Sequence, residues 1–215
     1  MAVSIRDYQL ENETHNLYDI TFYTNQIHTL LTHSPSLVDQ WLTETHQIHQ
    51  LNPSKPSTVG LDVEWRPNFS RNIDNPIAIL QLCVGHRCLI FQIMHSPFVP
   101  QSLKDFLTNK NGDYVFVGVG IENDVEKMLE DYDLGVGNTV DLRGLAVEKL
   151  GIIALKNAGL KQLTSQVLGK EIEKPKKISM SRWDYTWLTP NQVQYACLDA
   201  YLSCAIGDSL FSSHG

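Results

Sequence analysis

The stretch Gly60-Leu-Asp-Val-Glu-Trp65 places two carboxylates two residues apart in an otherwise apolar run. A β-strand has a side-chain period of two, so Asp62 and Glu64 share one face, with their Cα atoms roughly 6–7 Å apart. The apolar residues of the stretch take the opposite face, as expected for a strand that is buried on that side. Acidic pairs on strands are commonly exposed to solvent. Whether this pair belongs to a functional site therefore depends on which other residues lie on the same face of the sheet.

Downstream of this stretch, apolar runs alternate with amphipathic segments, which is typical of α/β proteins. Strands are predicted at 58–64, 77–84, 87–93, 114–119 and 139–142, and helices near 100–109, 122–132, 142–150, 158–168 and 189–211. The turn at 85–86 makes the second and third strands an antiparallel hairpin. The pattern predicts a mixed central sheet flanked by helices on both faces.

Residues 1–57 have a different pattern and are predicted to form an N-terminal extension that packs on the main domain, residues 58–215. The extension contains β-prone runs at 18–23 and 27–31 with a turn at 24–26, a helix over about 35–49 that begins at Ser34-Pro35, and a linker at 51–58. An exposed hairpin and an apolar-faced helix would suit an assembly surface.

The composition excludes several classes of protein. The formal net charge is −7, which is unsuited to a protein that binds nucleic acid by broad charge neutralisation but leaves room for a small local groove. No apolar stretch approaches the roughly 20 residues of a membrane helix, so no membrane partner is expected. The first fifteen residues lack the features of a secretory signal. The four cysteines lie in apolar runs without zinc-ligand spacing, which favours a reducing compartment.

Two further segments bring acidic residues to the same region. Asp124 follows the buried strand 114–119, at the edge where α/β sheets place their sites. Tyr195 and Asp199 are four residues apart on the last helix and share one face. Each signal is weak alone, because Asp124 could serve the helix dipole and Asp199 could form an ion pair. Together the carboxylates would repel one another, so the set indicates bound Mg²⁺ or Mn²⁺.

These residues resemble the three motifs of the DEDD exonuclease superfamily, tyrosine subclass, and in particular the Werner-type 3′–5′ exonuclease domain. The resemblance covers about residues 58–211 and is carried by LDVEWRP (61–67), AILQLCVGHRCLIF (78–91), GVGIENDVEKM (118–128), GLKQLTSQVLGKE (159–171), MSRWDYTWLT (180–189) and YACLDAY (195–201). It implies a ribonuclease H-like (DnaQ-like exonuclease) fold. Gly120 departs from the wider superfamily, in which many members carry asparagine, although the Werner branch tolerates glycine there.

The resemblance also implies a role for each acidic residue. Asp62, Glu64 and Asp199 would hold the first of two divalent cations, Asp62 would bridge to the second, and Asp124 would support the second through water. One cation would activate the attacking water and the other would stabilise the leaving 3′-oxygen, with release of nucleoside 5′-monophosphates. Tyr195 would act as general base or orient the water; with an ordinary pKa of about 10, orientation is the better role.

Substrate contacts are predicted from the residues around these motifs. Val63 and Trp65 flank the acidic pair and could bound the terminal nucleotide, with core packing as the alternative. A basic segment before the last helix is predicted to face phosphate, or to be a solvated loop; its site candidates are Lys176, Lys177, Arg182 and Trp183, and Lys170 and Lys174 precede them.

Other functions fit the sequence less well. A dinucleotide-binding site is rejected because Gly118 and Gly120 lack the third glycine of that fingerprint and follow the wrong strand. A non-catalytic interaction module is disfavoured, because such a module would not need the acidic residues of the three motifs, and this chain has all of them. A Werner-type DNA exonuclease in genome maintenance remains the main alternative to RNA trimming.

Residues 18–42 favour RNA, because they resemble the short plant branch of the Werner-type family. That branch includes RISC-interacting clearing exoribonucleases, which form homohexamers in the cytoplasm, associate with Argonaute and trim single-stranded RNA from its 3′ end. The resemblance therefore implies an RNA substrate with a free 3′ end, a possible Argonaute partner, a hexamer and a cytoplasmic location, with the nucleus as the alternative.

Overall fold

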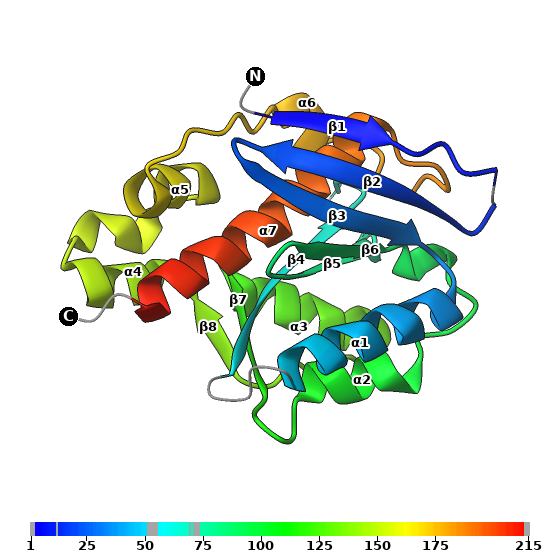
Figure 1. Ribbon diagram of the computed structural model, residues 1–215, viewed down its shortest axis with the longest axis horizontal. Helices are drawn as coiled ribbons and strands as arrows, with labels where there is room; N and C mark the ends of the chain where they lie inside the picture. Colours follow the sequence, from blue (N-terminus) through cyan, green and yellow to red (C-terminus); the bar gives the residue numbers. More distant parts are fainter. Residues whose placement is uncertain (1–2, 12, 51–55, 69, 71–73, 213–215) are drawn as a thin grey trace.

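A computed structural model describes residues 3–11, 13–50, 56–68, 70 and 74–212 of the chain. Its strands form one mixed sheet in the order β1-β2-β3-β6-β5-β4-β7-β8 (Figure 1). The strands are β1 (Val3–Asp7), β2 (His15–Phe22), β3 (Asn25–Thr32), β4 (Ser57–Trp65), β5 (Ile77–Val84), β6 (Arg87–Phe91), β7 (Tyr114–Gly118) and β8 (Thr139–Asp141). The mixed sheet predicted from the sequence is confirmed, and β1 is an additional edge strand that the sequence did not reveal.

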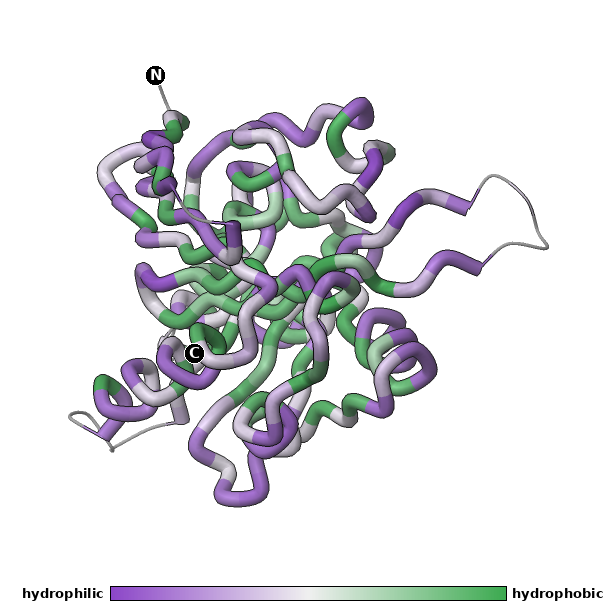
Figure 2. The backbone as a smooth tube through the Cα atoms, turned by 90° about the vertical axis from the view of Figure 1, so that its right-hand side faces the viewer, coloured by the Kyte–Doolittle hydropathy of each residue, from purple (hydrophilic) through white to green (hydrophobic). Residues whose placement is uncertain are grey.

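Helices cover both faces of this sheet, with a separate apolar core on each (Figure 1). One face carries α1 (Pro35–Gln50), α2 (Gln101–Thr108) and α3 (Ile121–Tyr132), and the other carries α4 (Leu142–Leu150), α5 (Leu160–Leu168) and α7 (Pro190–Ser212). The short helix α6 (Lys176–Ser179) and the 3₁₀ turns η1 (Ile93–His95) and η2 (Ile153–Asn157) lie in the connections. Hydrophobic residues concentrate in the centre of the molecule (Figure 2). None of the described helices combines the length and apolarity that a bilayer crossing requires.

The N-terminal hairpin extends the central sheet, because β3 pairs in parallel with β6. Its inner face is buried, so it does not stand out as an exposed hairpin; the buried side chains are Tyr18, Ile20, Phe22, Ile27 and Leu31. The apolar face of α1 is likewise buried in the core on its side of the sheet. The hairpin turn is Tyr23-Thr24, one residue earlier than predicted, with Tyr23 in the left-handed region. Residues 51–55 of the predicted linker lie outside the described residues.

Helix α7 crosses β4 in direct backbone contact at Gly60. A Cβ atom on Gly60 would lie 1.8 Å from the carbonyl oxygen of Ala200 and 2.7 Å from the amide nitrogen of Cys204. Only glycine permits so close an approach of helix to strand. The helix begins with a capping box, in which Thr189 Oγ1 accepts from the Gln192 amide at 3.3 Å and Gln192 Oε1 accepts from the Thr189 amide at 3.0 Å.

We expect Gly60→Ala to lower the free energy of unfolding by about 3 kcal/mol, because the new methyl group meets helix backbone that cannot rotate away. Chemical denaturation would measure the change. Gly144→Ala is the matched control: nothing lies within 4 Å of its added Cβ, so helix α4 should gain about 0.5–1 kcal/mol. Equal stability of the two variants would contradict the close approach.

Candidate active site

Three carboxylates from two elements meet beside the Gly60 contact. Asp62 and Glu64 project from β4, and Asp199 projects from α7 next to Ala200. One carboxylate oxygen from each lies within 4.8 Å of the others. The strand period and the helix register thus bring together the three residues that the sequence predicts as ligands of the first cation.

Burial and neighbouring negative charge oppose full ionisation of the three carboxyl groups. Burial raises the pKa of Asp62 well above its ordinary value, and the charges of Asp199 and Asp124 raise it further. Burial, followed by the charges of Asp62 and Asp199, does the same to the pKa of Glu64. Burial also raises the pKa of Asp199, against the opposing effect of Lys174. Crowded carboxylates that offer only oxygen ligands fit a divalent cation such as Mg²⁺ or Mn²⁺.

Asp124 approaches the trio from the first turn of α3, and its charge acts on both Asp62 and Glu64. Burial, aided by the Asp141 charge, raises the pKa of Asp124 to about 7. Gly120 caps this helix with φ at 76°, and its amide donates to Asp141 Oδ2 at 2.9 Å. Glycine and asparagine are the residues that adopt this left-handed region most readily, which explains why either can stand at this position.

Tyr195 lies one helical turn before Asp199 on α7, and its phenol lowers the pKa of that carboxyl group against the effect of burial. Burial, together with the Asp199 charge, raises the pKa of Tyr195 to about 12. The phenol therefore keeps its proton at neutral pH, which favours orienting a water molecule over accepting a proton from it. The indole of Trp183 packs behind the phenol, with ring centroids 5.9 Å apart.

Lys174 is a site residue that the sequence analysis assigned only to a basic segment. Its Nζ donates to Asp199 Oδ2 at 2.7 Å and lies 4.9 Å from the centroid of the Tyr195 ring. Burial would lower the pKa of Lys174, but the charges of Asp199 and Asp62 outweigh burial and raise it. The ammonium group therefore offsets part of the negative charge of the cluster. No periodic signal marks Lys174, because it lies in the irregular segment between α5 and α6.

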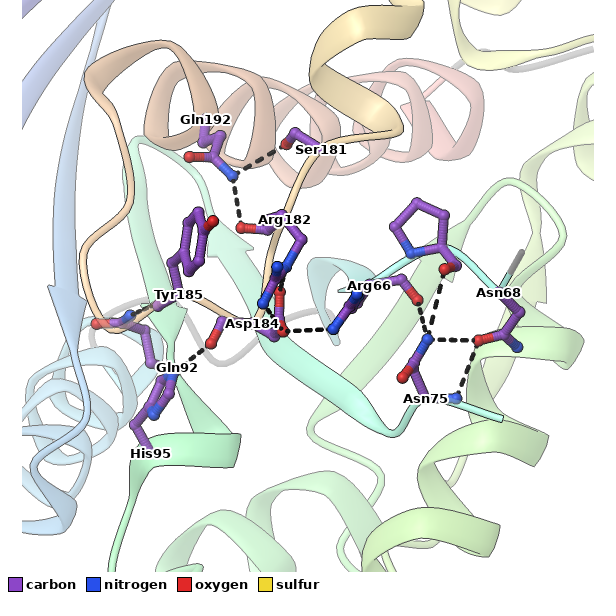
Figure 3. A network of polar contacts seen from close by, with 11 residues as sticks. Arg66, Asn68, Asn75, Gln92, His95, Ser181, Arg182, Asp184, Tyr185 and Gln192 are labelled. Atoms are coloured by element: carbon purple, nitrogen blue, oxygen red, sulfur yellow. Dashed lines mark hydrogen bonds and ion pairs between the residues drawn. The ribbon is translucent and has the colours of Figure 1, made fainter. Parts of the chain in front are cut away.

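A polar network holds the segment between α6 and α7 beside the end of β4 (Figure 3). Asp184 forms ion pairs with Arg182 at 2.7 Å and with Arg66 at 3.7 Å, and Arg66 follows the acidic strand directly. The backbone oxygen of Asp184 lies 3.1 Å from Nε2 of His95. From α7, Gln192 Nε2 donates to Ser181 Oγ at 3.0 Å and to the Arg182 carbonyl at 3.2 Å. The network fixes Arg182 and the residues after it relative to the carboxylates.

Two residues predicted to contact substrate, Val63 and Trp183, have buried side chains, and their substrate contacts stay a prediction. Val63 is 3% exposed and packs in the core on the face of the sheet opposite the carboxylates. Trp183 is 0% exposed, and its Nε1 donates to the Ser179 carbonyl at 3.1 Å, so it supports Tyr195 from within the core. Trp65 follows a register shift in β4 and packs against the same core as Val63, with Lys127 Nζ 5.3 Å from its ring centroid.

The side chains of the basic segment lie in different environments. Lys176 and Lys177 are exposed on α6 and stay candidates for phosphate contact. Arg182 is neutralised by Asp184, and its guanidinium lies 4.5 Å from the centroid of the exposed Tyr185 ring. Lys170 lies against the rings of Phe22 and Tyr23 at the tip of the hairpin.

Comparison with known proteins agrees with this geometry. Residues 35–212 match the family model described as a 3′-5′ exonuclease domain. The chain belongs to the 3′-5′ exonuclease family. The chain is 38% identical over 147 residues to a 3′-5′ exonuclease of Arabidopsis thaliana, a match that covers 67% of this chain and 49% of that protein. It is 37% identical over 158 residues to the bifunctional 3′-5′ exonuclease/ATP-dependent helicase WRN of Mus musculus, covering 73% of this chain and 11% of that protein.

Solved structures show the same fold at lower sequence identity. The chain superposes on the Aedes aegypti Nibbler EXO domain with a TM-score of 0.65 and 20% identity, over 85% of this chain and 87% of that one. It superposes on Escherichia coli RNase D with a TM-score of 0.65 and 18% identity, over 81% of this chain and 43% of that one. The ribonuclease H-like exonuclease fold implied by the sequence resemblance is confirmed. The chain spans about half or less of the curated relatives quoted above.

We expect Lys174→Met to destabilise the chelator-treated protein by about 3 kcal/mol, because the largely buried carboxylate of Asp199 loses its ion-pair partner. Saturating Mn²⁺ should restore much of the loss, since a bound cation replaces the missing positive charge. Denaturant unfolding with and without Mn²⁺ measures both effects. Lys176→Met, an exposed control two residues away, should change stability by less than about 0.5 kcal/mol. The same loss in both variants would rule out a special role for Lys174.

Proposed function

We propose that the protein is a metal-dependent 3′–5′ exonuclease that hydrolyses single-stranded RNA from its 3′ end and releases nucleoside 5′-monophosphates. The observation that carries the proposal is the meeting of Asp62, Glu64 and Asp199 within 4.8 Å, with Asp124 and Tyr195 beside them, in a chain of this family. The four carboxylates come from β4, α3 and α7. Their mutual repulsion lowers the stability of the fold unless cations occupy the cluster.

Each residue of the site has a distinct part in this reaction. Two bound divalent cations would supply the Lewis-acid chemistry of phosphodiester cleavage, generating the nucleophile and stabilising the leaving oxygen. Asp62, Glu64 and Asp199 would hold the first cation, and Asp62 and Asp124 the second. Tyr195 keeps its proton and orients the attacking water.

The substrate contacts follow from what is exposed near the network of Figure 3. Tyr185 is exposed, and the guanidinium of Arg182 lies against its ring, so the pair offers a surface on which a base can stack. Lys176 and Lys177 would contact phosphate from α6. This arrangement places a stacking surface and basic side chains on the segment that also carries Lys174 into the carboxylate cluster.

The choice of RNA and the cellular role rest on the resemblance of residues 18–42 to the short plant branch of the family. On that basis we propose a cytoplasmic enzyme that assembles as a homohexamer and clears RNA fragments in Argonaute-linked silencing. Light scattering tests the assembly: a solution mass of six chains supports it, and a mass of one chain refutes it. A DNA exonuclease of genome maintenance is the competing function.

Incubation of 5′-labelled single-stranded RNA with the protein and Mg²⁺ or Mn²⁺ should give a ladder that shortens from the 3′ end. Asp199→Asn removes a cation ligand and should reduce the rate by at least about 10³-fold, and a chelator should abolish cleavage. Asp208→Asn is the matched control, because Asp208 lies two turns further along the same helix, outside the carboxylate trio.

Matched DNA substrates distinguish the two functions. Faster degradation of single-stranded RNA supports the proposal, whereas a preference for recessed DNA 3′ ends supports the competing function, a DNA exonuclease of genome maintenance. Absence of cleavage on both substrates, from folded protein with Mn²⁺, would contradict an exonuclease.

A further inference from the structure

Gln81 is a buried polar residue without a partner in the described structure. It lies in the middle of β5 and is 0% exposed. Neither its Nε2 nor its Oε1 has a hydrogen-bond partner in the described part of the chain. Buried side-chain amides are almost always hydrogen-bonded, and leaving one unpaired costs free energy that an apolar residue of similar size would not. Packing within the sheet therefore does not explain why an amide side chain occupies this position.

The sheet register places Gln81 directly opposite Asp62. The two are paired residues of the antiparallel strands β4 and β5, so their side chains lie on the same face. Side chains of directly opposed residues have Cβ atoms about 4.5–5.5 Å apart, a separation that a glutamine amide spans easily. The nearest neighbours of Gln81 on this face within β5 and β6 are apolar: Ile79 and Cys83 along β5, and Ile90 across on β6. Asp62 is the polar residue paired directly with Gln81, so the amide can turn toward its carboxylate.

We propose that Gln81 is a positioning residue of the cation site, whose amide donates a hydrogen bond to the Asp62 carboxylate when the cluster holds its divalent cations. A carboxylate that binds a cation uses part of its oxygen lone pairs, and the remainder accept hydrogen bonds from surrounding groups, which fix its orientation. Gln81 suits this task because a central strand buried on both faces holds its side chain rigidly. This inference rests on the proposed function, since it requires that Asp62 be a cation ligand.

The test measures Mn²⁺ binding to the full chain by isothermal titration calorimetry, without nucleic acid. Gln81→Met keeps the length of the side chain but removes the amide, and we expect Mn²⁺ affinity to fall by about 10- to 100-fold. The chelator-treated variant should be at least as stable as the wild type, because it loses an unsatisfied amide. Leu80→Met is the control: Leu80 is the neighbouring residue of β5, is 1% exposed and faces the opposite core, so its substitution should leave Mn²⁺ affinity unchanged.

Two further measurements keep the test decisive if Gln81→Met does not fold. Gln81→Asn retains the amide but shortens the side chain by one methylene, so it should also weaken Mn²⁺ binding. In steady-state cleavage of RNA at fixed Mn²⁺, either variant should lower kcat while leaving KM for the oligonucleotide near the wild-type value. A merely structural glutamine would change neither Mn²⁺ affinity nor the split between kcat and KM.

The possible results separate this inference from the proposed function. Wild-type Mn²⁺ affinity in both variants, with wild-type protein that binds Mn²⁺, overturns the role of Gln81 alone. A loss of stability in chelator with unchanged Mn²⁺ affinity also overturns it, since the amide would then serve the fold. Failure of the wild-type protein itself to bind Mn²⁺ overturns the proposed function and, with it, this inference.

Discussion

The structure depends on one contact, the passage of helix α7 over strand β4 at Gly60. The strand supplies Asp62 and Glu64, and the helix supplies Tyr195 and Asp199, so these four side chains meet because the two backbones nearly touch. A side chain at Gly60 would meet the helix backbone itself. The close packing of α7 on β4 and the assembly of the carboxylates therefore depend on the same backbone contact.

That closeness has an energetic cost. The carboxylates of the trio are largely buried among like charges, which raises the pKa of each and opposes ionisation. Lys174 offsets part of this repulsion through its bond to Asp199, and bound cations would offset more. An unpaired amide at Gln81, across the sheet from Asp62, adds to the cost. Such concentrations of unfavourable terms are typical of sites that selection keeps for function rather than for stability.

Much of this arrangement could be predicted from the sequence, because it follows from periodicity. The strand period places Asp62 and Glu64 on one face, and the helical spacing pairs Tyr195 with Asp199. The elements from β4 to α7 lie close to their predicted ranges. The parallel pairing of β3 with β6 could not be predicted, since it joins segments distant in sequence and leaves no local pattern.

The burial of two predicted residues and the omission of two others have a common physical reason. Whether an apolar residue beside a site lines it or packs beneath it depends on tertiary contacts, and both Val63 and Trp183 pack beneath it. Lys174 reaches the cluster from an irregular segment, where spacing carries no directional information. Gln81 sits in an apolar strand, and its significance appears only from the register that sets it opposite Asp62.

Anomalous diffraction from crystals soaked in Mn²⁺ tests whether the carboxylate cluster binds the two cations of a phosphodiester hydrolase. We expect two anomalous peaks, one among Asp62, Glu64 and Asp199 and a second between Asp62 and Asp124, roughly 3.5–4 Å apart. Absence of both peaks, with Lys174 still bonded to Asp199 in well-ordered density, would contradict it.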